Sequence, residues 1–122
     1  MHTPTVRLAL RIIGEEIATV TVEGLCERLR VARPTLYGEF KRCLGETPGF
    51  TIRKTRLSRL CGVLDDKPGL TMQEAAVRCG YSTDSAAIRA FGEICGFTPS
   101  AFEKMAEMRG RHMTSLFDDE VG

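Results

Sequence analysis

Two segments of this chain carry nearly the same pattern of residues, and this internal duplication constrains the fold more than any other feature. The segments are "LCERLRVARPTLYGEFKRCLGETP" (residues 25–48) and "AAVRCGYSTDSAAIRAFGEICGFTP" (residues 75–99). At an offset of 50 residues before a short break and 51 after it, the matched pairs are Thr21 with Thr71, Arg28 with Arg78, Val31 with Tyr81, Phe40 with Phe91, Gly45 with Gly96, Thr47 with Thr98 and Pro48 with Pro99. Two copies indicate a duplication rather than a longer repeat array.

Each copy has the signals of a helix-turn-helix unit. The dipeptide Thr-Pro occurs at residues 3–4, 47–48 and 98–99. A threonine hydroxyl accepts a hydrogen bond at a helix start, and a proline in the first turn lacks an N–H that would have no partner there. Gly45 and Gly96 follow apolar runs with helical spacing and predict helix ends. Each copy is therefore a short helix, a tight turn and a longer helix.

The helical pattern continues along the chain, and no convincing alternating strand pattern occurs. We expect helices at about residues 4–18, 22–29, 33–44, 48–64, 72–79, 83–95 and from Pro99 onward, with Thr21, Thr71 and Ser82 as caps and "DDKPG" (residues 65–69) as a linker. The expected buried residues include Leu8, Ile12, Ile13, Ile17, Leu36, Phe40, Leu44, Ile52, Leu57, Leu60, Leu64, Ile88, Phe91, Cys95 and Phe102. The predicted fold is all-α, with about seven helices in two helix-turn-helix subdomains joined by a long linker helix.

The expected boundaries follow from these elements. Residues 1–46 form an N-terminal helix-turn-helix subdomain, residues 47–66 the linker helix and residues 67–112 a C-terminal subdomain. Residues 113–122 form an acidic tail that we expect to be mobile.

Charge is distributed unevenly, although the net charge of the chain is only +1. Residues 28–59 hold nine cations and two anions, a balance of +7, whereas residues 1–27 carry −2 and residues 60–122 carry −4. Such asymmetry indicates a polyanionic partner for the middle of the chain.

The residues do not favour a metal-binding protein, an enzyme, a secreted protein or a membrane protein. The five cysteines, at positions 26, 43, 61, 79 and 95, show no metal-binding spacing, and we interpret them as small buried residues of a reducing cytoplasm. There is no phosphate-binding loop, no Ser-His-Asp spacing and no paired carboxylates. No secretory signal or membrane span is apparent. We therefore expect neither an enzyme nor a cofactor or metal site.

The duplicated pattern resembles the AraC/XylS family of bacterial transcription regulators over about residues 8–102. The first half matches at Leu36, Phe40-Lys41, Gly45-x-Thr47-Pro48, Ile52 and Arg56-Leu57, and the second half at Ala75-Ala76, Gly80-Tyr81, Ser85, Arg89-x-Phe91, Gly96-x-Thr98-Pro99 and Phe102. The resemblance implies sequence-specific binding of double-stranded DNA, in the cytoplasm and on the nucleoid. The length resembles members that consist of the DNA-binding domain only, with no small-molecule effector domain.

The resemblance also implies the DNA-contacting residues, by position. The first recognition helix would present Arg33, Pro34, Thr35, Tyr37 and Gly38, with Lys41 and Arg42 nearer the DNA backbone, and the second would present Thr83, Asp84, Ser85, Ile88 and Arg89. Arginine pairs bidentately with guanine, which favours Arg89 for direct reading. Two such helices on a spacer of roughly 25 Å would reach successive major grooves, about 34 Å apart.

Departures from the family pattern predict that the two halves contribute unequally. Gly38 stands where the family often has arginine, Ala32 replaces a usual serine cap, and Gly92 and Glu103 replace basic residues. Since phosphate contacts supply much of the affinity for DNA, we expect the first half to hold the DNA and the second to add limited base reading or to dock on a partner.

Two alternatives stay open at this point. One is a protein-binding adaptor that docks on RNA polymerase or another regulator, with weak or no DNA binding of its own. The other is that these residues are the C-terminal part of a longer regulator.

Overall fold

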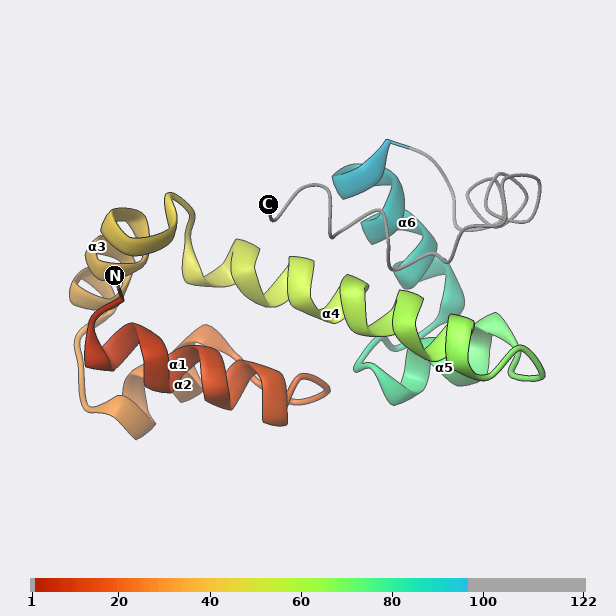
Figure 1. Cartoon of the computed structure of the whole chain (residues 1–122), viewed down its shortest axis with the longest axis horizontal. Helices are drawn as coiled ribbons and strands as arrows, with labels where there is room; N and C mark the ends of the chain where they lie inside the picture. Colours follow the sequence, from red (N-terminus) through yellow and green to blue (C-terminus); the bar gives the residue numbers. More distant parts are fainter. Residues whose placement is uncertain (1, 97–122) are drawn as a thin grey trace. The chain divides into compact units, whose positions relative to one another are not determined.

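A computed structural model describes residues 2–96, which form six α-helices and no strand in that range (Figure 1). The helices are α1 (Pro4–Glu15), α2 (Val22–Leu29), α3 (Arg33–Leu44), α4 (Pro48–Asp66), α5 (Met72–Arg78) and α6 (Asp84–Cys95). The prediction of an all-α fold is confirmed. The helix expected from Pro99 and the acidic tail lie outside the described residues.

The described residues divide into two compact units, which meet in the sequence between Thr55 (the end of unit 1) and Arg56 (the start of unit 2). Unit 1 contains α1, α2, α3 and the start of α4, and unit 2 contains the rest of α4 with α5 and α6. The subdomain boundaries expected from the sequence stay a prediction.

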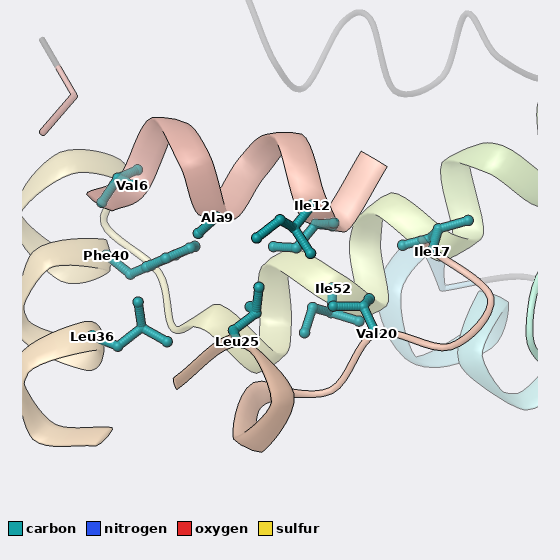
Figure 2. Packing of buried hydrophobic residues seen from close by; sticks show 10 residues of the cluster. Val6, Ala9, Ile12, Ile17, Val20, Leu25, Leu36, Phe40 and Ile52 are labelled. Atoms are coloured by element: carbon teal, nitrogen blue, oxygen red, sulfur yellow. The ribbon is translucent and has the colours of Figure 1, made fainter. Parts of the chain in front are cut away.

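The core of unit 1 forms where α1 and α2 pack against α3. Leu36 and Phe40, one helical turn apart, are fully buried on the inner face of α3, and Figure 2 shows the Phe40 ring extending toward Ala9 of α1. The other members of this cluster are Val6, Ile12, Ile13, Ile17, Val20, Leu25 and Ile52.

Unit 1 differs from the prediction at α1. The helix ends at Glu15 rather than near Ala18, because Glu16 leaves helical geometry (φ −122°, ψ 37°), although the following turn still buries Ile17. The expected buried residue Leu8 is 46% exposed. The inward face of α1 is set by Val6, Ala9 and Ile13 at helical spacing, which leaves Leu8 at its flank.

Unit 2 is built around small side chains. Ala75 and Ala76 of α5, Cys79 directly after that helix and Ala87 of α6 are buried beside Phe91, Leu57, Leu60 and Cys61. Small residues let these helices approach closely around the Phe91 ring. Ile88, expected on the apolar side of α6, is 37% exposed instead, because Ala87 and Phe91 define the buried face. The helix α4 continues to Asp66, so the predicted linker begins two residues later than expected.

The turn between the two helices has a left-handed residue and the same backbone hydrogen-bond pattern in both units. Arg30 and Gly80 adopt left-handed backbone conformations, with φ of 55° and 100°. In each turn, two N–H groups donate back to the last turn of the preceding helix, which is the Schellman arrangement. The bonds are Val31 N to Cys26 O (3.1 Å), Arg30 N to Glu27 O (3.4 Å), Tyr81 N to Ala76 O (3.0 Å) and Gly80 N to Val77 O (3.2 Å). The duplication seen in the sequence is thus a duplication of backbone structure.

Helix caps follow the predicted residues with one exception. The hydroxyls of Thr3, Thr21 and Thr71 accept from the N–H groups of Val6, Gly24 and Glu74. The α6 cap is Thr83, which accepts from Ala86 N at 3.1 Å, so the prediction of Ser82 as the cap is wrong. The cause is the one-residue insertion in the second turn, which moves the helix start to the residue equivalent to Ala32.

We predict that Arg30→Gly stabilises unit 1. A left-handed conformation strains any residue with a Cβ by roughly 1–2 kcal/mol, and glycine removes this strain. Glycine also has a higher conformational entropy in the unfolded chain, which offsets part of the gain in folding free energy. The free energy of unfolding in urea is expected to rise by about 0.5–1 kcal/mol. Arg30→Ala is the control for loss of the charged side chain, and an Arg30→Gly variant no more stable than Arg30→Ala would contradict the prediction.

The cysteines occupy two kinds of environment. Cys61 and Cys79 are buried, and Cys26, Cys43 and Cys95 are half-buried, so the expectation of five buried cysteines is wrong for three of them. Burial raises the pKa of both the Cys61 and the Cys79 thiols, because the thiolate loses its hydration. Their thiols are held in the unreactive form.

We therefore expect Cys61 and Cys79 to react with iodoacetamide at least about tenfold more slowly than the other three cysteines at pH 8. Peptide mass spectrometry of the folded chain at successive times measures the rates, and modification in urea gives the unprotected reference. Equal rates at Cys61 and Cys26 in the folded chain would refute the assignment.

Candidate nucleic-acid interface

The seven residues predicted to contact DNA from α3 are spread over the sides of the helix away from Leu36, and five of them are exposed. Pro34, Gly38 and Lys41 follow one line along the helix, because they are four and three residues apart. Arg33 and Tyr37 lie along one side of this line, and Thr35 and Arg42 lie along the other. Tyr37 and Gly38 are half-buried, and the other five residues are exposed. The face opposite carries the buried Leu36 and Phe40, so α3 is anchored on one side and open on the other.

The predicted residues of α6 have the equivalent arrangement. Ser85 and Arg89 lie on the line that corresponds to Pro34 and Gly38, and both are exposed. Asp84 and Ile88 take the places of Arg33 and Tyr37. Thr83 precedes the helix as its cap, where its hydroxyl oxygen accepts from Ala86 N and its O–H can still donate.

Arg33 and Tyr37 form one cluster at the start of α3. The Arg33 Nη2 donates to the Tyr37 hydroxyl at 3.3 Å, and the guanidinium carbon lies 5.5 Å from the centroid of the Tyr37 ring. Its Nη1 is 4.0 Å from Glu23 Oε1 of α2. The hydrogen bond with Tyr37 raises the pKa of Arg33, which stays fully charged. The cluster presents a cation and an aromatic ring together at the N-terminus of α3.

A different contact holds the start of α6. Gln73 of α5 accepts from the backbone N–H of Asp84 through its Oε1, at 2.8 Å. The first N–H groups of a helix have no intrahelical acceptor, so this bond satisfies a donor that the helix itself cannot. Glu23 and Gln73 were not among the predicted site residues. The signal that would have found them is their equivalent position, two residues after the caps Thr21 and Thr71.

Cations of the basic stretch divide into two groups. Arg28 is paired with Glu16, and Lys54 is paired with Glu46 at 2.9 Å and lies 5.7 Å from the centroid of the Phe50 ring. Glu46 also accepts from the Thr51 hydroxyl at 2.6 Å. By contrast, Lys41 and Arg42 are exposed on α3. The helix α3 thus carries three exposed cations, Arg33, Lys41 and Arg42, and other exposed cations of unit 1 lie at Arg7, Arg11, Arg30 and Arg53.

The recognition helices α3 and α6 differ in net charge. The helix α3 carries Arg33, Lys41 and Arg42 against Glu39, whereas α6 carries Arg89 against Asp84 and Glu93. The equivalent helices therefore have balances of +2 and −1. A polyanion would be attracted more strongly to α3 than to α6.

Other kinds of site are less well supported. An open hollow of about 550 Å³ in unit 1 is lined by Val20, Thr21, Val22, Thr47, Gly49, Phe50, Ile52 and Arg53, a largely apolar set. Within residues 2–96 no three His, Cys, Asp or Glu side chains are grouped so as to hold a metal ion. In the same range, no helix combines the length and the apolar character needed to cross a membrane.

Comparisons with known proteins agree with this geometry. A family profile described as "Helix-turn-helix domain" matches residues 25–105, more than half of the chain. A search of curated proteins finds no match.

Solved structures with the same fold include domains of two response regulators and of one transcriptional factor. The C-terminal domain of AraT, a response regulator from Geobacillus stearothermophilus, is 27% identical with a TM-score of 0.78, over 84% of this chain and 86% of that one. The DNA-binding domain of AdpA, a global transcriptional factor solved in complex with a target DNA, is 22% identical with a TM-score of 0.75, over 87% and 95%. The C-terminal domain of the response regulator yesN from Fusobacterium nucleatum is 22% identical with a TM-score of 0.73, over 82% and 98%.

Proposed function

The chain belongs to the AraC/XylS-type helix-turn-helix family of DNA-binding transcription regulators, and from that premise we propose how it reads DNA. The outward faces of α3 and α6 enter the major groove of double-stranded DNA, in two successive turns of the duplex. The family is one of transcription regulators and not of enzymes.

One observation carries this proposal. Both recognition helices have 12 residues, follow the same left-handed turn and expose their N-terminal residues while burying a leucine or alanine and a phenylalanine behind them. In a helix-turn-helix unit, these N-terminal residues are the ones that reach base edges. The neighbouring AdpA domain, solved with a target DNA, supports DNA as the ligand of such a surface.

The side chains suggest distinct roles for the two helices. Lys41 and Arg42 are suited to phosphate contacts, and Arg33 stacked beside Tyr37 is suited to phosphate or base. On α6, Arg89 is the side chain fitted to bidentate reading of guanine. Pro34, Thr35 and Gly38 of α3 and Thr83, Asp84, Ser85 and Ile88 of α6 complete the proposed interface. Since α3 has the larger positive charge, unit 1 supplies most of the affinity, and unit 2 refines the sequence preference.

A protein partner is a second proposal. On α5, Val77 is 52% exposed, whereas the equivalent position of α2 carries the charged Glu27. An exposed valine within an acidic half favours contact with another protein, such as RNA polymerase or a second regulator, over contact with phosphates. Such a regulator would act in the cytoplasm, on the nucleoid.

The dependence of binding on salt separates DNA binding from docking on a protein. We expect the logarithm of the association constant for a 30-base-pair duplex to fall with the logarithm of salt concentration, with a slope of about −3 or steeper, because each phosphate contact contributes about −0.9. Fluorescence anisotropy measures the affinity. The absence of binding at about 50 mM salt would contradict the DNA-binding proposal and favour the protein partner.

The ranking of the two units is tested by charge removal. Lys41→Ala with Arg42→Ala should weaken DNA binding by tenfold or more and reduce the salt slope by about 2, whereas Arg89→Ala should weaken binding less and reduce discrimination between sequences. Arg7→Ala with Arg11→Ala removes two exposed cations from α1 and serves as the matched control. A larger loss of affinity for Arg89→Ala than for the double variant would reverse the ranking.

A further inference from the structure

Equivalent side chains of α2 and α5 reach the first residue of the following recognition helix. Glu23 and Gln73 each stand two residues after a threonine cap, and Arg33 and Asp84 each open a recognition helix. The pairs are 10 and 11 residues apart, since the second turn holds one more residue. In both units the contact links the first helix to the first residue of the recognition helix, across the turn that joins them.

The two contacts use different chemistry. In unit 2, Gln73 accepts from the backbone of Asp84 at 2.8 Å, so the side chain fixes the helix itself. In unit 1, Glu23 lies 4.0 Å from the Arg33 guanidinium, and Ala32 makes no side-chain capping bond. The side chains of Arg33 and Glu23 are 57% and 84% exposed, so their ion pair is weak and yields to salt or to a DNA phosphate.

We propose that Gln73 is a positioning residue that sets how α6 presents its base-reading side chains, and that Glu23, at the equivalent position of unit 1, instead competes with DNA phosphate for Arg33. This inference rests on the proposed function. The bond from Gln73 and the bond from the Thr83 cap hold two of the first three backbone donors of α6, at Asp84 N and Ala86 N. Ser85 lies between these two anchored positions, and Arg89 follows one turn later on the same face. Loss of the Gln73 bond releases the end of α6 from α5 without removing any DNA-contacting group.

The consequence differs between the units because the chemistry differs. Without Gln73, α6 keeps its charge and its buried anchors Ala87 and Phe91 but loses one of the bonds that hold its N-terminus, so selectivity falls and binding to unrelated sequences does not change. Without the Glu23 carboxylate, Arg33 keeps Tyr37 as its partner and loses a competing anion, so binding to all sequences becomes tighter.

The experiment uses the full chain and a duplex selected from a random library, with a scrambled duplex of the same length for comparison. Gln73→Met removes the acceptor and keeps the side-chain length, and Gln73→Glu restores an acceptor of the kind that unit 1 carries at this position. Ser82→Ala, at an exposed neighbour in the same turn, is the matched control. Amide hydrogen exchange at Asp84, measured by NMR without DNA, reports the bond directly.

We expect Gln73→Met to accelerate Asp84 exchange about threefold or more and to lower affinity for the selected duplex about tenfold, with the scrambled duplex changed by less than twofold. Gln73→Glu should restore both the slow exchange and most of the selectivity, and Glu23→Gln should tighten binding to both duplexes. Unchanged exchange and selectivity in Gln73→Met, or an equal loss on both duplexes, overturns the proposal. A wild-type chain that binds no duplex overturns the proposed function and the reading role of Gln73 with it, while Asp84 exchange still decides whether Gln73 holds α6.

Discussion

The left-handed turn that joins the two helices of each unit is the constraint on which the other features depend. Its paired N–H bonds end the first helix of each unit and set the backbone conformation from which the recognition helix starts. From that start, the Phe40 side of α3 and the Phe91 side of α6 face the core. The outward residues are then exposed as a consequence of core packing.

The duplicated backbone carries two unlike surfaces. Unit 1 has a charged recognition helix that starts without a side-chain cap, whereas unit 2 has a well-capped helix of lower charge. Gly38 puts no side chain at the position of α3 that corresponds to Arg89 on α6. A homodimeric regulator repeats one surface and suits palindromic sites, but a single chain with two different surfaces suits a site without such symmetry. The proposed division between affinity in unit 1 and selectivity in unit 2 rests on the same divergence.

Much of the local structure could be predicted from the sequence, because caps, glycine ends and apolar spacing act over a few residues. The bounds of α2 and α3 and the buried Leu36 and Phe40 are confirmed. The exposure of Leu8 and Ile88 could not be predicted, since helical spacing does not distinguish the centre of an apolar face from its flank. The contacts of Glu23 and Gln73 were also missed, because they depend on how one helix is placed against another. The DNA-contacting roles of the predicted residues stay predictions.

The central claim is that two unequal helix-turn-helix units of one chain read DNA through the exposed N-termini of α3 and α6. Hydroxyl-radical footprinting on a selected duplex tests it most directly. The account predicts two protected patches on one face of the duplex, about 10 base pairs apart within a site of about 20, with the patch assigned to α6 weakened selectively by Arg89→Ala. A single patch, or two patches that respond equally to Arg89→Ala, would contradict it.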